Sequence, residues 1–124
     1  MSLHEEYEKF VASRCKKGGD INLSVAERHI LHMLLGLSGE VGELVDALKK
    51  SIIYNKVLDT NNVIEELGDI EFYLAGLRNG LRKAGYDIPD ANMILARNMS
   101  KLTRRYPEGY TDQAAQARAD KQAR

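Results

Sequence analysis

Apolar residues recur three and four positions apart in four segments of the chain, with polar residues between them. This spacing is typical of amphipathic helices, and it predicts four of them, at about residues 3–17, 25–53, 62–83 and 90–105. Ser2 and Ser24, each followed three residues later by a glutamate, have the spacing of capping boxes at the first two helix starts. Residues 54–61 form a loop in which Asp59 or Thr60 caps the third helix.

Each predicted helix carries an apolar stripe, as a helix needs in order to pack in a bundle. No run alternates at period two, so the sequence predicts an all-α, four-helix bundle-like fold. The second and third helices are rich in apolar residues for so short a chain, and we therefore expect oligomerisation to complete the bundle. Their predicted core faces comprise Ile30, Leu34, Leu37, Val41, Leu44, Val45 and Leu48, and then Ile64, Leu67, Leu74, Leu77 and Leu81.

The composition indicates one soluble globular domain, since the chain has 124 residues, of which 44% are hydrophobic and 29% charged. Eighteen basic residues balance 18 acidic ones, so no bulk charge attracts nucleic acid or a membrane. The sequence has no apolar run of membrane-spanning length and no signal peptide, and Cys15 is its single cysteine. We expect a cytoplasmic protein with a domain at residues 1–110. Residues 111–124 form a polar, Ala-rich tail, either a short helix or disordered.

Two pairs of acidic residues stand three positions apart on two different predicted helices. Glu40 and Glu43 lie on the second helix, and Glu66 and Asp69 lie on the third. This spacing puts both carboxylates of a pair on one helix face, beside the apolar stripe. If the two helices pack as an antiparallel pair, the four carboxylates converge at the edge of the core.

Such a cluster needs bound protons or a cation, because two like charges about 4 Å apart repel by ~4 kcal/mol at an effective dielectric near 20. Oxygen ligands without Cys or His suit a hard cation, so the pattern predicts Mg²⁺, or alternatively Mn²⁺. Either pair alone is common on a solvated helix face, but both pairs beside the core favour a metal site. A carboxylate di-iron site would need Glu-x-x-His motifs, which neither His29 nor His32 completes.

Glycines interrupt the second helix at Gly36, Gly39 and Gly42. Each costs ~1 kcal/mol relative to alanine inside a helix. Their regular spacing indicates the close approach of another backbone or of a ligand, and both interpretations stay open.

Cationic and polar residues could complete a phosphate site. Lys50 lies two turns beyond Glu43, near the same helix face. Asn98, Lys101 and Arg105 form a polar stripe on the fourth helix, which fits either a phosphate clamp or an ordinary solvated surface.

The ordered set of motifs resembles that of a known enzyme family. The segment Gly39-Glu40-Val41-Gly42-Glu43, a 22-residue spacer and then Glu66-Leu67-Gly68-Asp69 are similar to the Glu-x-x-Glu, spacer, Glu-x-x-Asp signature of all-alpha NTP pyrophosphohydrolases. The chain resembles the MazG-like branch of these enzymes in three further segments, Asp46-Ala47-Leu48-Lys49-Lys50, Asn98-Met99-Ser100-Lys101-Leu102 and Arg105-Tyr106-Pro107-Glu108-Gly109. The resemblance covers about residues 31–110.

This resemblance implies an enzyme that hydrolyses an NTP or dNTP to the monophosphate and pyrophosphate, with water attacking the alpha phosphorus. The metal-binding and catalytic carboxylates that it implies are Glu40, Glu43, Glu66 and Asp69. The phosphate contacts that it implies are Lys50, Asn98 and Lys101, with Arg105 on the same stripe. It also implies a homodimer or homotetramer. We expect the base-reading residues in the first helix and near the start of the second, where His29, His32 and Leu35 are candidates.

Other functions stay open. A dimeric dUTP or dCTP pyrophosphatase, or a phosphoribosyl-ATP pyrophosphohydrolase, shares the acidic signature and differs in base selectivity. A non-catalytic helical nucleotide-binding or interaction protein is the alternative of a different class. Such a protein, however, gains nothing from four mutually repelling carboxylates.

Overall fold

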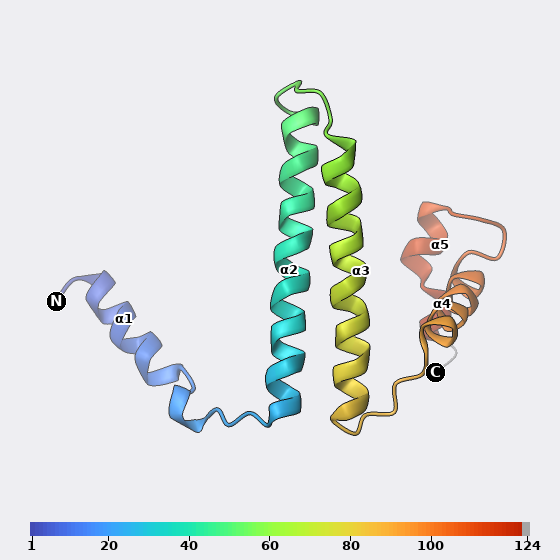
Figure 1. The fold of residues 1–124 in the computed structure, drawn as a ribbon. Helices are drawn as coiled ribbons and strands as arrows, with labels where there is room; N and C mark the ends of the chain where they lie inside the picture. The colour runs from blue at the N-terminus through green and yellow to red at the C-terminus, as the bar shows by residue number, and fades with distance from the viewer. Residues whose placement is uncertain (123–124) are drawn as a thin grey trace. The chain divides into compact units, whose positions relative to one another are not determined.

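The computed structural model describes residues 1–122, which are mostly helical (Figure 1). In chain order the elements are α1 (Leu3–Arg14), the 3-10 turn η1 (Gly18–Asp20), α2 (Val25–Ile52), α3 (Thr60–Lys83), α4 (Ala91–Arg105), α5 (Asp112–Ala117) and α6 (Ala119–Gln122). The predicted all-α class is confirmed. None of the helices in the described residues has both the length and the apolar character that crossing a membrane requires.

Side-chain caps fix the helix starts, largely as the sequence predicts. Ser2 and Ser24 each accept a hydrogen bond from the main-chain N–H of a glutamate three residues on, and each glutamate side chain accepts one in return. Of the two candidates for α3, Asp59 is the cap, and it accepts a bond of 3.1 Å from the N–H of Asn62. These bonds satisfy amide donors that a helix start otherwise leaves unpaired.

Two predicted boundaries are wrong. α1 ends at Arg14 rather than near residue 17, because Cys15 turns to extended backbone and Gly18 opens a separate 3-10 turn. Glycines lose the most conformational freedom in a helix, so they favour this early end. α3 starts at Thr60 rather than near residue 62, because its cap lies one residue earlier.

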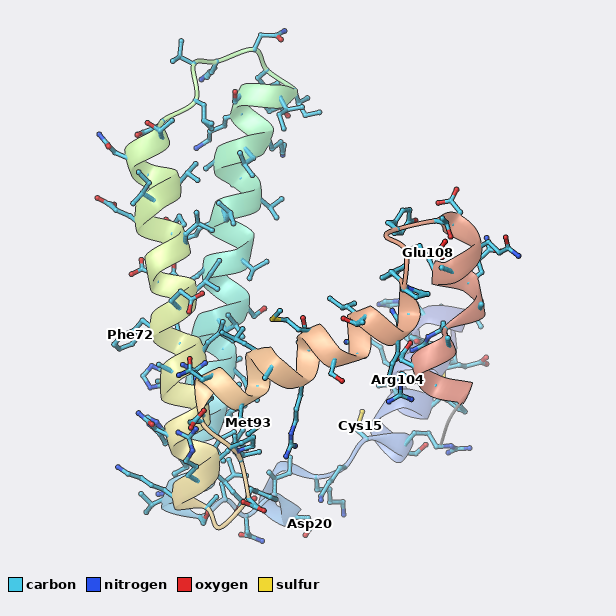
Figure 2. The ribbon with its side chains drawn as sticks, turned by 90° about the vertical axis from the view of Figure 1, so that its right-hand side faces the viewer. Cys15, Asp20, Phe72, Met93, Arg104 and Glu108 are labelled. Carbon is cyan, nitrogen blue, oxygen red and sulfur yellow. The ribbon has the colours of Figure 1, made fainter. Side chains whose placement is uncertain are left out.

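Helices α2 and α3 lie side by side as an antiparallel pair, as both views show (Figures 1 and 2). Large side chains of one helix lie against glycines of the other: His29 on Gly80, Met33 on Gly76 and Tyr73 on Gly36. A Cβ atom added at Gly36 would overlap the ring of Tyr73. Helix packing is therefore the role of this glycine.

These contacts set the register of the pair. Each step of three or four residues along α2 is matched by an equal step backwards along α3. Two further steps of the same kind place Glu40 opposite Asp69, and Glu43 opposite Glu66. The packing of glycines and large side chains thus brings the two acidic pairs together.

The apolar residues of the two helices form two stripes rather than one. Met33, which is 6% exposed, is the buried hydrophobic residue of the described chain. Part of each predicted core face is half-buried, namely Ile30, Leu37, Leu44, Leu48, Leu74, Leu77 and Leu81. The rest is exposed, namely Leu34, Val41, Val45, Ile64 and Leu67. Within the single chain the predicted core face of each helix is thus only partly covered, because one partner helix shields only one side of each helix. Burial of the rest by a second copy stays a prediction.

A second compact unit begins at Gly85, inside the range predicted as one domain. Here α4 contacts α5 and α6, so residues 111–122 of the predicted tail take the helical form of its two predicted states, and residues 123–124 lie outside the described residues. The Arg105 guanidinium donates to both carboxylate oxygens of Asp120, at 2.7 and 3.2 Å, and the Asp120 side chain is only 2% exposed. This ion pair lowers the pKa of Asp120 and raises that of Arg105.

We predict that Gly36→Ala lowers the free energy of unfolding by up to about 2 kcal/mol, because the overlap with Tyr73 costs more than the gain in helix propensity. Gly42→Ala is the matched control, since no atom lies within 4 Å of an added Cβ there, and it should gain up to ~1 kcal/mol. Urea unfolding followed by circular dichroism measures both. Equal changes in the two variants would contradict the packing described above.

Candidate active site

Three carboxylates from α2 and α3 converge on the helix pair. Glu40, Glu43 and Glu66 each offer one oxygen, and these oxygens all lie within 4.8 Å of one another. Glu40 and Glu43 are one turn apart on α2, and Glu66 meets them from α3, as the register requires. The structure therefore brings together three of the four predicted metal ligands.

Two oxygens of this cluster are buried without a hydrogen-bond partner, Oε2 of Glu40 and Oε2 of Glu66. Glu66 is only 7% exposed, whereas Glu43 is open to solvent. A buried acceptor left unpaired costs ~1–3 kcal/mol, and more when it is charged. A cation between the carboxylates would satisfy both oxygens at once.

The pKa of Glu66 is raised from 4.5 to about 7. Hydrogen bonding with Glu40 is the largest cause and burial is the second. Hydrogen bonding with Glu43 and the negative charges of Glu43 and Glu40 raise the pKa further. A neighbouring carboxylate favours the neutral form, because two like charges cannot both ionise cheaply in one place. Near neutral pH the cluster therefore binds a proton, or a cation in its place. An all-oxygen cluster without Cys or His fits a hard divalent cation.

Asp69, the fourth predicted ligand, lies one turn beyond Glu66 on α3 and is exposed. Its carboxylate is not among the three that converge. The register places it opposite Glu40, at the edge of the cluster rather than within it.

A groove of about 550 Å³ extends from the acidic cluster over the end of α2 and the loop to α3. Glu43 and Glu66 line one part of it, and Lys50 and Lys56 line another. The sequence pattern does not predict Lys56 as a groove residue, because a loop residue has no helical periodicity that relates it to the acidic pairs. Asn62 also lines the groove.

Two of the three glycines inside α2 border this groove. Gly39 and Gly42 both line it, and no atom lies within 4 Å of a Cβ added at either position. The packing interpretation of the glycine series holds for Gly36, and the ligand interpretation stays a prediction for Gly39 and Gly42. Gly36 admits a neighbouring side chain, whereas Gly39 and Gly42 leave space next to the carboxylates.

The remaining predicted site residues lie elsewhere in the chain. His29 contacts the carbonyl oxygen of Gly76 at 3.3 Å and stands about 16 Å before Glu40 along the helix axis. His32 is exposed on the same helix. Asn98 and Lys101 are exposed on α4, in the second unit, where Arg105 is occupied by Asp120. Their roles in base and phosphate binding stay predictions.

A comparison with protein-family models found a match that covers this part of the chain. The model of the MazG nucleotide pyrophosphohydrolase domain matches residues 28–110, which include the whole acidic cluster and its groove. The chain belongs to the MazG family. No curated protein and no solved structure matches it. The resemblance drawn from the motifs is confirmed, and MazG membership supports nucleotide pyrophosphohydrolase activity in general.

MazG domains generally depend on a divalent metal, and the three-carboxylate cluster could hold one. The chain's own chemistry fits such an ion on two counts, the unpaired buried oxygens and the raised pKa of Glu66.

In the metal-free protein we predict that Glu66 makes thermal stability fall as the pH rises from 5 to 8. Because its pKa is raised from 4.5 to about 7, the folded state holds this proton more tightly than the unfolded state. The stabilisation is full below the unfolded pKa and is lost as the pH rises through the folded one. Mg²⁺ or Mn²⁺ should therefore raise the melting temperature at pH 8 and change it little at pH 5.

Glu66→Gln is the control for this pH effect, since it keeps the shape of the side chain and cannot ionise. The fall in stability between pH 5 and pH 8 should be smaller in this variant. A melting temperature with the same pH dependence in both proteins would show that Glu66 is not the group responsible.

Proposed function

We propose that this protein is a Mg²⁺-dependent pyrophosphohydrolase that cuts an NTP or dNTP to its monophosphate and pyrophosphate, with Mn²⁺ as an alternative ion. The convergence of Glu40, Glu43 and Glu66 around two unpaired buried oxygens carries the proposal. The adjoining groove with its two lysines supports it. When bound, the metal supplies neutralisation of phosphate charge and activation of the attacking water.

The chain's own residues would divide the work between metal and phosphate. Glu40, Glu43 and Glu66 hold the metal, and Asp69 completes the set from the edge of the cluster. Lys50 faces the substrate phosphates in the groove. Asn98 and Lys101 of α4 stay the further phosphate contacts that the family resemblance implies. Arg105 is the candidate on the same stripe, and in the structure it is paired with Asp120. His29 and His32 are proposed for the base.

Residues 1–110 form the catalytic domain in this proposal, and residues 111–124 form the tail. The family match covers residues 28–110 of this range. The Arg105–Asp120 ion pair ties the tail to α4.

We predict pyrophosphate release from one or more members of a panel of NTPs, dNTPs and common damaged nucleotides with Mg²⁺, and none with EDTA. Glu43→Gln and Asp69→Asn should each lower kcat at least about a hundredfold, because even residues that only support a metal ligand are worth 10–100-fold. Both variants should keep the wild-type fold, since Glu43→Gln removes a charge from the repulsive cluster and Asp69 is exposed. Circular dichroism checks the fold and a coupled pyrophosphate assay checks the rate.

Glu65→Gln is the matched control, because Glu65 neighbours Glu66 on α3 but is exposed and outside the cluster. It should retain wild-type turnover. Equal loss in Glu65→Gln and Glu43→Gln would contradict the assignment. If the folded, metal-loaded protein released no pyrophosphate from any member of the panel, NTP hydrolysis would be contradicted. The result would favour a phosphoribosyl nucleotide as the substrate, or a non-catalytic binding protein. The ranking within the panel separates a dUTP or dCTP enzyme from a broader one.

We also propose that a second copy of the chain covers the outer stripe of the α2–α3 pair, giving a homodimer or a homotetramer. Leu34, Val41 and Val45 on α2 are exposed, as are Ile64 and Leu67 on α3. Fully burying one such side chain is worth ~1.5–3 kcal/mol.

We predict a mass of at least two chains in size-exclusion chromatography with light scattering, and a smaller mass for Val45→Glu, which places a charge in the outer stripe. Val57→Glu is the control, because Val57 is just as apolar and is 98% exposed in the loop. A monomeric wild-type protein at micromolar concentration would contradict the proposed assembly.

A further inference from the structure

The loop after α2 folds back on the helix and brings Lys56 to the groove. The main-chain N–H of Lys56 donates to the carbonyl oxygen of Lys50, at 3.2 Å. Asn55 adopts a left-handed conformation, with φ of 55°, which turns the chain at this point. Asparagine is among the few residues that tolerate this conformation. The main chain of Lys56 is thus held beside the last turns of α2. Lys56 is also one of the residues that line the groove.

The two lysines of the groove differ in their charge partners. The Lys50 ammonium lies 3.1 Å from a carboxylate oxygen of Asp46, one turn earlier on α2. Within residues 1–122, no acidic side chain forms an ion pair with Lys56. The nearby Asp59 carboxylate already accepts the N–H of Asn62 as the cap of α3. Within residues 1–122, Lys56 is therefore the groove lysine without an ion-pair partner.

The groove has an acidic part and a basic part along α2. Lys50 stands seven residues after Glu43, which corresponds to about 10 Å along the helix axis. The hydrogen bond to Lys50 sets Lys56 near the same level. A triphosphate anchored at the carboxylates by a metal would extend toward the lysines, and the long lysine side chain can meet it.

We propose that Lys56 binds the distal phosphates of the nucleotide, the pair that leaves as pyrophosphate. The inference rests on the proposed function, because it takes the acidic cluster as the site of the metal and the alpha phosphate. The ammonium group donates charge-assisted hydrogen bonds to phosphate oxygens. Lys56 is a substrate-binding residue in this scheme and takes no part in proton transfer. Lys50 serves the same end less directly, since phosphate must compete with Asp46 for it.

The test compares Lys56→Met with the wild-type protein, because methionine keeps an unbranched apolar side chain and removes the charge. Calorimetry measures the Kd of pyrophosphate in the presence of Mg²⁺, and steady-state kinetics measures KM and kcat for the best substrate of the panel. Loss of one charged hydrogen-bond donor should weaken pyrophosphate binding about ten- to hundredfold and raise KM by a similar factor. Affinity for Mn²⁺ alone, for the nucleoside monophosphate, and kcat should change less than about threefold, a free-energy change within ~0.7 kcal/mol.

Two further variants control for charge and for the loop. Lys56→Arg keeps the charge and should bind pyrophosphate within a few fold of wild type. Lys17→Met removes an exposed lysine far along the chain from the groove and should behave as wild type. If Lys56→Met binds pyrophosphate as tightly as Lys17→Met does, the inference is overturned. It is also overturned if Lys56→Arg is as weak as Lys56→Met, since the loss would then reflect the loop rather than the charge.

The outcome separates this inference from the proposed function. Suppose that the wild-type protein turns over no nucleotide but binds Mg²⁺ and binds pyrophosphate through Lys56. This result would contradict the proposed hydrolysis and support the role of Lys56. A protein that hydrolyses nucleotides with unchanged KM in Lys56→Met would support the hydrolysis and sink the role of Lys56.

Discussion

Mutual repulsion among three carboxylates is the constraint on which the site depends. Glu40, Glu43 and Glu66 hold their oxygens within 4.8 Å of one another. Hydrogen bonding with Glu40, burial, and then the neighbouring charges raise the pKa of Glu66 to about 7. Two of the oxygens are buried and unpaired. A fold that keeps such a cluster needs something positive between the helices, and an all-oxygen ligand set suits a hard divalent ion. The groove beside the cluster is also lined by two lysines, and these suit the phosphates of a nucleotide bound to such an ion.

The packing of α2 on α3 holds this cluster in place. Glycines at 36, 76 and 80 admit Tyr73, Met33 and His29, so the two backbones lie close and in a fixed register. In this register Glu43 on α2 lies opposite Glu66 on α3. Gly39 and Gly42 continue the series on α2 without a facing side chain, and they border the groove instead. The same helix pair leaves an apolar stripe outside, which a second copy would bury.

Much of this arrangement could be predicted from the sequence, because caps and acidic spacing are local patterns. Ser2, Ser24 and Asp59 start their helices as their side chains require. The division of apolar residues into two stripes could not be predicted, since Leu34 and Leu37 look equivalent until a partner helix is placed. The ion pair of Arg105 with Asp120 joins residues 15 apart, and Lys56 reaches the groove through a loop. Neither contact follows from periodicity.

The most direct test of this account is to locate a divalent ion in crystals of the protein. Mn²⁺ stands in for Mg²⁺ here, because it also prefers oxygen ligands and scatters X-rays anomalously. The account predicts one or more anomalous peaks among the carboxylates of Glu40, Glu43 and Glu66, with Asp69 turned toward them. Crystals saturated with Mn²⁺ near pH 8 that show no peak between these residues would contradict it.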